Sequence, residues 1–337
     1  MSSLTVGLVF ETFDTYPRDP SDPPDAHAEF EPESTIGALE SAIEFLGHRP
    51  HRLGSPLALL EAAGRGGLAD IDVAFNLAEG FGGRNREAWA PVVLEMAGIP
   101  TIGSDALSLS LSLDKAWANR HVAAAGVPVA AQSTLASGRE AEGADLPAPF
   151  PLFVKPRWEG TAKGIRASSR VEDRAALAAE VERVTGTYRQ PALVEAFVPG
   201  PEYTVTLIGN GPPEALPVVQ RALERETGIG LHALEGPGAD AEGLDHVTPG
   251  ALEPVLEAEL ARLAVRAFEA LDCRDFARAD FRLDREGRPV FLEINPLPTF
   301  ATDGTFAILA ELEGVGLDEM LGRCVRAGLR RLGLDER

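Results

Sequence analysis

The sequence has few cysteines and no long apolar run, and each scarcity excludes a class of protein. Its two cysteines, Cys273 and Cys324, are too few and too widely separated for a zinc site or a disulfide framework. Cys273 lies beside apolar residues and is expected to be a core thiol rather than a nucleophile. No stretch approaches the roughly 20 apolar residues of a membrane span. The first apolar run lacks the basic flank of a signal peptide, so we expect a cytoplasmic protein that does not bind membranes.

Positive charge is also scarce. The net charge of −21 argues against a general affinity for nucleic acid or anionic membranes. Only three of the 31 basic residues are lysines, namely Lys115, Lys155 and Lys163. A lysine ammonium is a compact charge that suits phosphate oxygens, so these positions are candidates for binding a phosphorylated ligand. The alternative is that they are ordinary surface residues of an arginine-rich chain.

A length of 337 residues predicts two or three domains. In residues 1–113, strand and helix patterns alternate, which is typical of an open parallel sheet. Residues 114–205 have the pattern of a small α+β lobe, and residues 206–337 combine helices with a two-stranded hairpin. The expected strands are 5–10, 70–76, 151–155, 192–198, 202–209, 276–283 and 289–294. The expected helices are 87–97, 114–125, 172–184, 252–270, 305–313 and 317–332. One more is expected to begin near Ser34, as its N-cap, and to end at Gly47.

A long polar segment, 11–34, separates the first strand from the first helix and is rich in Asp and Pro. Segments of this length without regular structure are unusual inside a compact domain. They are either disordered or act as functional lids, and the sequence leaves both readings open.

The hairpin at 276–294 carries the most specific group of polar residues. Asp280 lies in its first strand, and Glu293 and Asn295 lie two residues apart in its second, so these two side chains share a face. Three oxygen ligands of this kind suit Mg²⁺, with substrate phosphates completing the coordination. Arg278 projects to the same face as Asp280, where it can neutralise a phosphoryl group. The alternative is an acidic hairpin with solvated charges.

A turn that follows Lys155 has the composition of a phosphate-binding loop. Gly160 and Gly164 let the backbone bend closely around a ligand, and Thr161 and Lys163 lie between them. Alone, this pattern fits a surface turn equally well.

The segment 194–202 can line an adenine pocket. Phe197 and Val198 would supply apolar contact and backbone hydrogen bonds, and Glu195 and Glu202 would accept from the exocyclic amine and the ribose hydroxyls. The alternative is a strand–turn–strand with solvated glutamates.

Together these segments resemble the ATP-grasp superfamily, and specifically the D-alanine–D-alanine ligases. The resemblance implies a three-domain ATP-grasp fold of mixed α/β and α+β class. It has an N-terminal open parallel sheet, a small central lobe and a C-terminal lobe, with ATP between the last two. The resemblance rests on FNLAEGFGG (75–83), LEMAGIPTIGSDALSLSLSLDKAWANR (94–120), PLFVKPRWEGTAKG (151–164), LVEAFVPGPEYTV (193–205) and ARADFRLDREGRPVFLEINPLP (277–298).

The resemblance also implies roles for individual residues. Lys115 and Lys155 match the lysines that contact the ATP phosphates, and Lys163 falls inside the phosphate loop beside Thr161. Arg278 matches the arginine that stabilises the acyl phosphate and the tetrahedral intermediate. The other matches are the adenine pocket (Glu195, Phe197, Val198), the ribose-binding acid (Glu202) and the magnesium ligands (Asp280, Glu293, Asn295).

The activity implied is ATP-dependent joining of a small-molecule carboxylate to an amine. The carboxylate attacks the γ-phosphate of ATP between two Mg²⁺ ions, for which Mn²⁺ can substitute, and the amine then displaces phosphate from the acyl phosphate. The resemblance further implies that the central lobe closes over ATP and that the protein is a homodimer.

The sequence departs from the family where the amino-acid substrates are bound. A long segment replaces the family's short Gly-Gly-Ser turn, and Glu33 is the candidate for the glutamate that holds the first amine. An equally good reading makes Glu33 a helix N-terminal acid favoured by the helix dipole. Glu79 stands where the family often has a histidine, and Gly304 falls near its substrate-binding serine. The chain reads Asn-Pro-Leu-Pro-Thr at 295–299, where the family reads Asn-Thr-x-Pro-Gly.

The family's mobile loop, which carries a Tyr and a Lys, corresponds here to residues 221–246. These offer Arg221, Arg225 and His232 instead. Three hypotheses follow: a ligase for amino-acid-like substrates other than two D-alanines, a D-alanine–D-alanine ligase with a divergent pocket, and an ATP-binding protein without catalysis. The presence of the metal ligands and Arg278 argues against the third.

Overall fold

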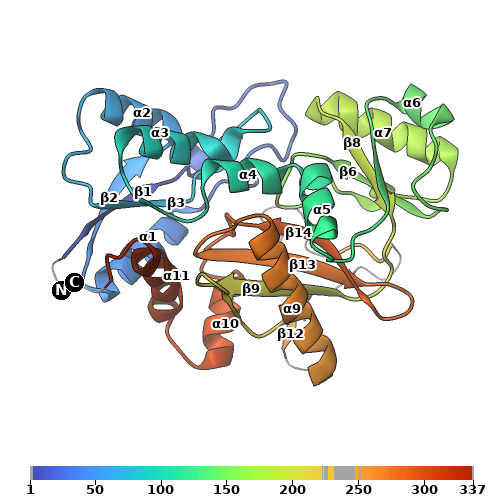
Figure 1. The fold of residues 1–337 in the computed structure, drawn as a ribbon. Helices are drawn as coiled ribbons and strands as arrows, with labels where there is room; N and C mark the ends of the chain where they lie inside the picture. Colours follow the sequence, from blue (N-terminus) through green and yellow to red (C-terminus); the bar gives the residue numbers. More distant parts are fainter. Residues whose placement is uncertain (1–2, 222, 224–226, 231–246, 250–251, 336–337) are drawn as a thin grey trace.

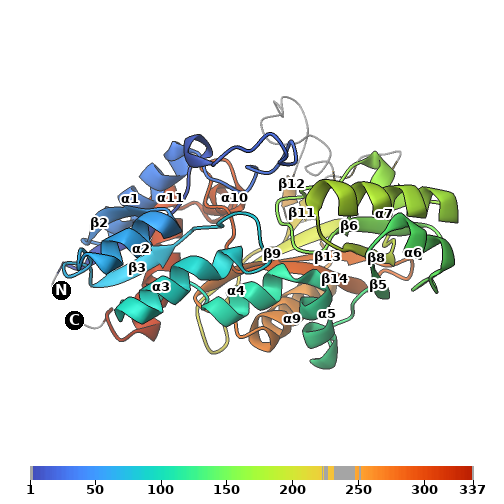
Figure 2. The ribbon, with the colours of Figure 1, turned by 90° about the horizontal axis from the view of Figure 1, so that it is seen from above.

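The computed structural model describes residues 3–221, 223, 227–230, 247–249 and 252–335, and these form three β-sheets (Figure 1). Seen from above, the N-terminal unit and the central lobe lie at opposite ends of the molecule, with the strands of the third sheet between them (Figure 2). No helix among the described residues is both long and apolar enough to cross a bilayer.

The N-terminal sheet is parallel, as the alternation of strand and helix predicts. Its strand order is β2 (Arg49–Gly54), β1 (Thr5–Val9), β3 (Val73–Asn76) and β4 (Thr101–Ile102). Its helices are α1 (Glu33–Phe45), α2 (Pro56–Gly64) and α3 (Trp89–Ala97), with short 3₁₀ turns at Phe13–Thr15 and Arg86–Ala88. The expectation that Ser34 caps α1 is wrong, because Pro32 occupies the N-cap position and Ser34 is already helical.

The central lobe is a four-stranded antiparallel sheet that carries two helices on one face. Its strand order is β5 (Gln132–Leu135), β8 (Ala192–Ala196), β6 (Leu152–Pro156) and β7 (Arg170–Val171). The helices are α6 (Gly138–Gly143) and α7 (Arg174–Tyr188), and a 3₁₀ turn spans Ala167–Ser169. Two helices, α4 (Ala106–Leu113) and α5 (Lys115–Ala124), connect this lobe to the N-terminal unit.

The third sheet contains the predicted hairpin. Its strand order is β12 (Val247–Pro249), β11 (Val219–Arg221), β9 (Glu202–Ile208), β13 (Phe276–Leu283) and β14 (Pro289–Asn295), while β10 (Glu214–Ala215) pairs with β9. Helix α9 (Pro254–Ala270) packs on this sheet. Strand β9 was expected in the central lobe, but it pairs with β13 and β11 in the third sheet. Ala118 and Val122 of α5 also join the core beneath this sheet, so the boundaries expected near 114 and 205 do not separate the packed units.

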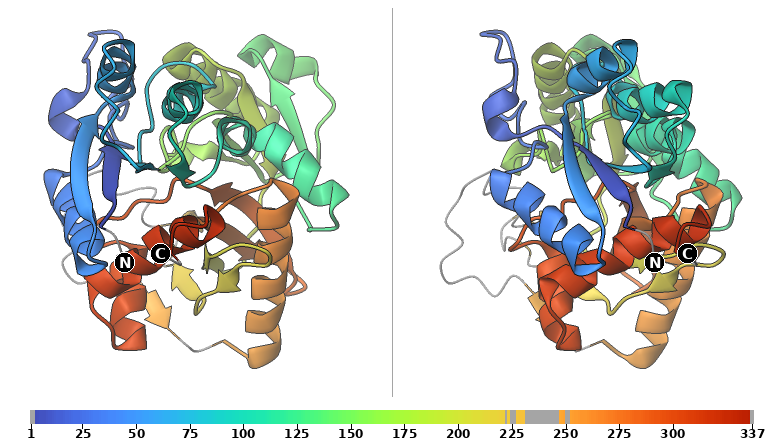
Figure 3. Two further views of the ribbon diagram at one scale, coloured as in Figure 1. Left: turned by 60° about the vertical axis from the view of Figure 1, so that its left-hand side comes forward. Right: turned by 90° about the vertical axis from the view of Figure 1, so that its left-hand side faces the viewer.

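The last two helices, α10 (Thr305–Glu313) and α11 (Leu317–Arg331), return to the N-terminal unit. Leu321 and Cys324 of α11 share one core with Val6 and Leu8 of β1 and with Ile36 of α1. The opposite face of the N-terminal sheet is covered by α2 and α3. Strand β1 and helix α11 therefore lie side by side (Figures 1 and 3). Both cysteines are buried and free, which for Cys273 confirms the expected core thiol.

Replacement of Leu321 tests whether α11 supports the N-terminal unit. Leu321 is fully buried, so Leu321→Ala removes apolar contacts and leaves a cavity. We expect a loss of roughly 2–5 kcal/mol in the free energy of unfolding, measured by urea titration. Leu60→Ala is the control, because Leu60 is 53% exposed. Equal urea midpoints for the two variants would contradict the shared core.

Candidate functional site

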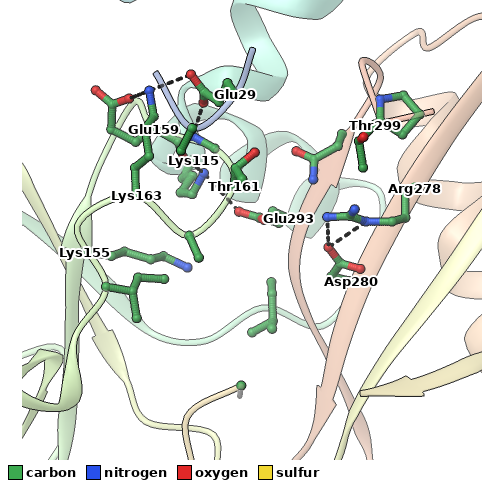
Figure 4. A pocket seen from close by; sticks show the side chains of 18 of the residues that line it. Glu29, Lys115, Lys155, Glu159, Thr161, Lys163, Arg278, Asp280, Glu293 and Thr299 are labelled. Carbon is green, nitrogen blue, oxygen red and sulfur yellow. Dashed lines mark hydrogen bonds and ion pairs between the residues drawn. The ribbon is translucent and has the colours of Figure 1, made fainter. Parts of the chain in front are cut away.

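A cavity of about 890 Å³ lies between the three units and is lined by residues from all of them. The sequence-predicted residues meet here from separate elements: Lys155 on β6, the turn at 160–164, and the hairpin of β13 and β14. Figure 4 shows the lysines on one side of the cavity and Arg278 with Asp280 on the other. The predicted residues that line the cavity are Lys115, Lys155, Thr161, Lys163, Glu195, Phe197, Val198, Glu202, Arg278, Asp280, Glu293 and Asn295.

Glu33 is the one predicted residue that does not line the cavity. Its side chain is 65% exposed on the first turn of α1, where it forms an ion pair with Arg52. The reading of Glu33 as an amine-binding residue is therefore corrected in favour of a helix N-terminal acid. Three other acids of the preceding segment do line the cavity: Asp25, Glu29 and Glu31.

Residues of the hairpin take part in two oppositely charged pairs. Asp280 and Glu293 are cross-strand neighbours, as are Arg278 and Asn295. Arg278 Nη2 lies 3.1 Å from Asp280 Oδ2, and Lys115 Nζ lies 2.9 Å from Glu293 Oε2. Burial alone would raise the pKa of Glu293, but Lys115 and Lys155 lower it to about 2. Glu293 is therefore ionised at neutral pH.

The same hairpin fits a divalent cation. Asp280, Glu293 and Asn295 are oxygen donors of the kind that Mg²⁺ prefers, and all three line the cavity. The described residues contain no group of three His, Cys, Asp or Glu side chains arranged to hold a metal. The protein thus offers two carboxylates and one amide, and substrate phosphates would have to complete the coordination.

The residues expected to bind the nucleotide form one wall of the cavity, and their charged side chains pair with one another. Lys155 Nζ lies 2.9 Å from Glu195 Oε1. Burial would lower the pKa of Lys155, but Glu195 and Glu293 raise it, so the ammonium stays charged. Burial, reinforced by Asp280, raises the pKa of Glu202 to about 7.

Phe197 is the aromatic surface of this wall. The guanidinium carbons of Arg170 and Arg282 lie 4.7 Å and 5.3 Å from the centre of its ring. Such contacts hold a ring in place through cation–π attraction. Val198 is buried beside it.

The turn at 160–164 has a strained backbone. Thr161 and Ala162 adopt positive φ angles of 46° and 56°, which residues with a Cβ rarely adopt. Gly164 has φ of 78°, and a Cβ there would lie 2.5 Å from Pro156. Strain of this kind persists only where surrounding contacts impose it.

Glu29 supplies those contacts and was not identified from the sequence. Its Oε1 accepts from the Gly160 amide at 2.7 Å, and its carboxylate also accepts from Lys163. Arg86 Nη2 contacts both of its oxygens, at 2.8 Å and 2.9 Å. Burial would raise the pKa of Glu29, but Arg86 and Lys163 lower it. The segment 11–34 is thus bound to the phosphate loop by a buried ion network.

A second carboxylate holds the other end of the loop. Asp25 accepts from the Gly164 amide at 2.8 Å and from the Tyr188 hydroxyl at 2.7 Å. The two glycines that let the loop bend are therefore both held by acids of the segment 11–34. This arrangement favours the reading of that segment as a lid.

Other departures from the family also line the cavity. Arg221 Nη2 donates to Thr305 Oγ1 at 2.8 Å, next to Gly304 at the N-cap of α10. Glu79 lines the wall formed by the N-terminal unit. Arg225 and His232 lie outside the described residues.

Replacement of Glu29 should destabilise the protein and change its response to acid. Glu29→Gln leaves Arg86 and Lys163 buried without their main carboxylate, which should cost roughly 3–5 kcal/mol at pH 7. Because the pKa of Glu29 is lowered from 4.5 to about 2, its stabilisation is present above pH 4.5 and is lost as the pH falls toward 2. The free energies of unfolding of the unmodified protein and of Glu29→Gln, measured by urea titration, should therefore converge across that interval.

Glu33→Gln is the matched control, since Glu33 belongs to an exposed ion pair. Such pairs contribute roughly 0–1 kcal/mol. A Glu29→Gln protein as stable as the Glu33→Gln protein would show that the buried network does not stabilise the fold.

Comparisons with known proteins agree with this geometry. Residues 122–326 match the family described as D-ala D-ala ligase C-terminus. The chain is 34% identical over 264 residues to a D-alanine–D-alanine ligase of Halorhodospira halophila, which covers 78% of this chain and 82% of the relative. It is 35% identical over 259 residues to an uncharacterised protein, y4sG, of Sinorhizobium fredii, covering 77% and 75% of the two chains.

Two solved structures share the fold. One is a D-alanine–D-alanine ligase from Bacillus anthracis complexed with ATP, with a TM-score of 0.64, 18% identity and coverage of 99% of both chains. The other is the VanG D-Ala:D-Ser ligase from Enterococcus faecalis, with a TM-score of 0.69, 18% identity and coverage of 97% of this chain and 100% of that one. The expected three-unit ATP-grasp fold is confirmed, and this chain belongs to the D-alanine–D-alanine ligase family.

Proposed function

We propose that this protein is an ATP-dependent carboxylate–amine ligase that forms an amide bond through an acyl phosphate, with amino-acid-like substrates other than two D-alanines. One observation carries the proposal: a single cavity joins three lysines to a hairpin that bears Arg278, Asp280 and Glu293. Cations that bind a polyphosphate thus face oxygen ligands that suit a divalent cation.

In the first step, a carboxylate oxygen of the acyl donor attacks the γ-phosphorus of ATP, and the bond to the β-phosphate oxygen breaks to release ADP. Lys115, Lys155 and the loop that contains Thr161 and Lys163 hold the phosphates and offset their charge. The loop also covers the acyl phosphate, which water would otherwise hydrolyse.

In the second step, the amine nitrogen attacks the acyl carbon, loses a proton, and displaces inorganic phosphate as the carbon–oxygen bond breaks. The guanidinium of Arg278 stabilises the negative charge on the tetrahedral intermediate. Arg221 and the N-terminus of α10 together favour a carboxylate, which supports an amino acid as the acceptor.

Asp280, Glu293 and Asn295 would hold Mg²⁺, or Mn²⁺ in its place, and the bound ion would supply positive charge to the transferred phosphoryl group. Glu195, Phe197, Val198 and Glu202 would contact the adenosine. A homodimer located in the cytoplasm belongs to the same proposal and rests on family resemblance.

A genuine D-alanine–D-alanine ligase is the second candidate function, because the relative from Halorhodospira halophila carries that name. The replaced substrate residues, Glu79 and Gly304 among them, favour different substrates. A binding protein without catalysis is the least supported candidate, since both Arg278 and the metal-ligand set line the cavity.

The test is ATP-dependent phosphate release with Mg²⁺ across single and paired D- and L-amino acids, amines and dipeptides. Turnover that requires a pair other than two D-alanines is expected. Efficient turnover with D-alanine alone would establish the second candidate instead.

Asp280→Asn should lower the rate of phosphate release at least about 100-fold, because it removes a carboxylate from the phosphoryl-transfer site. Glu286→Gln, in the turn of the same hairpin, is the control, since the Glu286 side chain is 64% exposed. Full activity of Asp280→Asn would exclude this hairpin as the metal site.

A further inference from the structure

Two carboxylates of the cavity, Glu79 and Glu87, have too little positive charge beside them. Glu79 and Glu87 lie on the connection between β3 and α3, and both line the cavity. Glu87 is only 7% exposed, whereas Glu79 is half-buried. Among the described residues, neither carboxylate has a hydrogen bond, and the nearest cation to Glu87 is Arg86, with Nη2 at 3.9 Å.

The neighbouring cations are already engaged. Arg86 directs its Nη2 atom to both oxygens of Glu29, and Lys163 forms ion pairs with Glu29 and Glu159. These two cations are therefore shared by four carboxylates, those of Glu29, Glu79, Glu87 and Glu159. Lys115 does not supply the missing positive charge, because its ammonium is paired with Glu293.

This excess of negative charge is costly in a cavity wall. A buried carboxylate without a counter-charge is unfavourable, and it responds by holding a proton or by binding a cation. Burial and the charge of Glu87 raise the pKa of Glu79 well above its usual range. Burial and the charge of Glu29 likewise outweigh Arg86 and raise the pKa of Glu87 to about 7.

The position of these acids indicates which substrate they contact. Arg86 Nη1 donates to the carbonyl of Trp158 at 2.8 Å, which fixes the connection against the phosphate loop. The acyl donor must present its carboxylate at that loop. Its remaining groups then lie beside Glu79 and Glu87, whereas the acceptor end lies near Arg221 and α10.

We propose that Glu79 and Glu87 bind cationic groups of the acyl donor, and that this donor is a basic amino acid with a second positive charge on its side chain. The inference rests on the proposed ligase function. One α-ammonium neutralises one carboxylate, so the second carboxylate requires an ammonium or guanidinium on the side chain. A small neutral amino acid such as alanine leaves that charge uncompensated.

The experiment compares basic donors with neutral donors of the same length: lysine with norleucine, and ornithine with norvaline, each as D and L isomers. The assay measures KM and kcat for ATP-dependent phosphate release with a saturating panel of amines. Basic donors should have KM values at least about tenfold lower than their neutral counterparts.

Glu79→Gln and Glu87→Gln should each raise the KM for the basic donor about tenfold or more while the KM for ATP changes less than about twofold. The ratio of KM values for neutral and basic donors should fall, which a purely structural role would not produce. Glu61→Gln is the matched control, because the Glu61 side chain is 68% exposed.

The outcomes separate this inference from the function on which it rests. Turnover with neutral donors at equal or lower KM, unchanged in Glu79→Gln, overturns the basic-donor inference and leaves the ligase intact. If no donor releases phosphate, the ligase proposal fails, and calorimetry with lysine, Mg²⁺ and a non-hydrolysable ATP analogue decides the inference alone. If lysine binds and Glu79→Gln weakens that binding, the basic-donor inference is supported. If lysine does not bind, the inference is overturned.

Discussion

The buried ion network of Glu29, Arg86 and Lys163 is the interaction on which the arrangement of the cavity depends. It joins the segment 11–34, the connection after β3 and the phosphate loop, which are separated by 57 to 134 residues in the chain. Removing charges from water is costly, and the cost is offset only when every member has its partner. The network therefore holds the strained loop in one geometry, and it also consumes the positive charge that Glu79 and Glu87 lack.

The acidic composition of the chain explains why its few lysines are all paired. Lys115 contacts Glu293, Lys155 contacts Glu195, and Lys163 contacts Glu29. On the proposed function, incoming phosphates take over these ammonium groups, and the released Glu293 becomes available to the divalent cation. Binding of the nucleotide then exchanges the partners of the lysines instead of adding charge, so it creates little uncompensated charge in the cavity.

The sequence predicted best where signals are local. The hairpin at 276–283 and 289–295 follows from alternating residues and a short turn, and its polar residues meet as two-residue spacing requires. Glu33 was expected in the cavity, but its side chain is exposed on the first turn of α1, and a position at the start of a helix does not by itself indicate which way a side chain points. Strand β9 was assigned to the wrong unit because periodicity identifies a strand but not its neighbours. Glu29 carried no signal, since its partners are distant in the chain and its surroundings are a polar segment without periodicity.

The return of α11 to the N-terminal sheet has a consequence for synthesis on the ribosome. Residues of β1 and α1 emerge well before α11, so the apolar face they share with Leu321 and Cys324 is covered only after α11 has also been made. The N-terminal unit cannot complete its core as an independent nascent domain, in contrast to the usual order in which domains fold as they emerge. The central lobe, whose core in the described part of the chain lies between residues 135 and 194, can fold earlier. Strand β1 and helix α1 thus emerge before the central lobe but complete their packing after it.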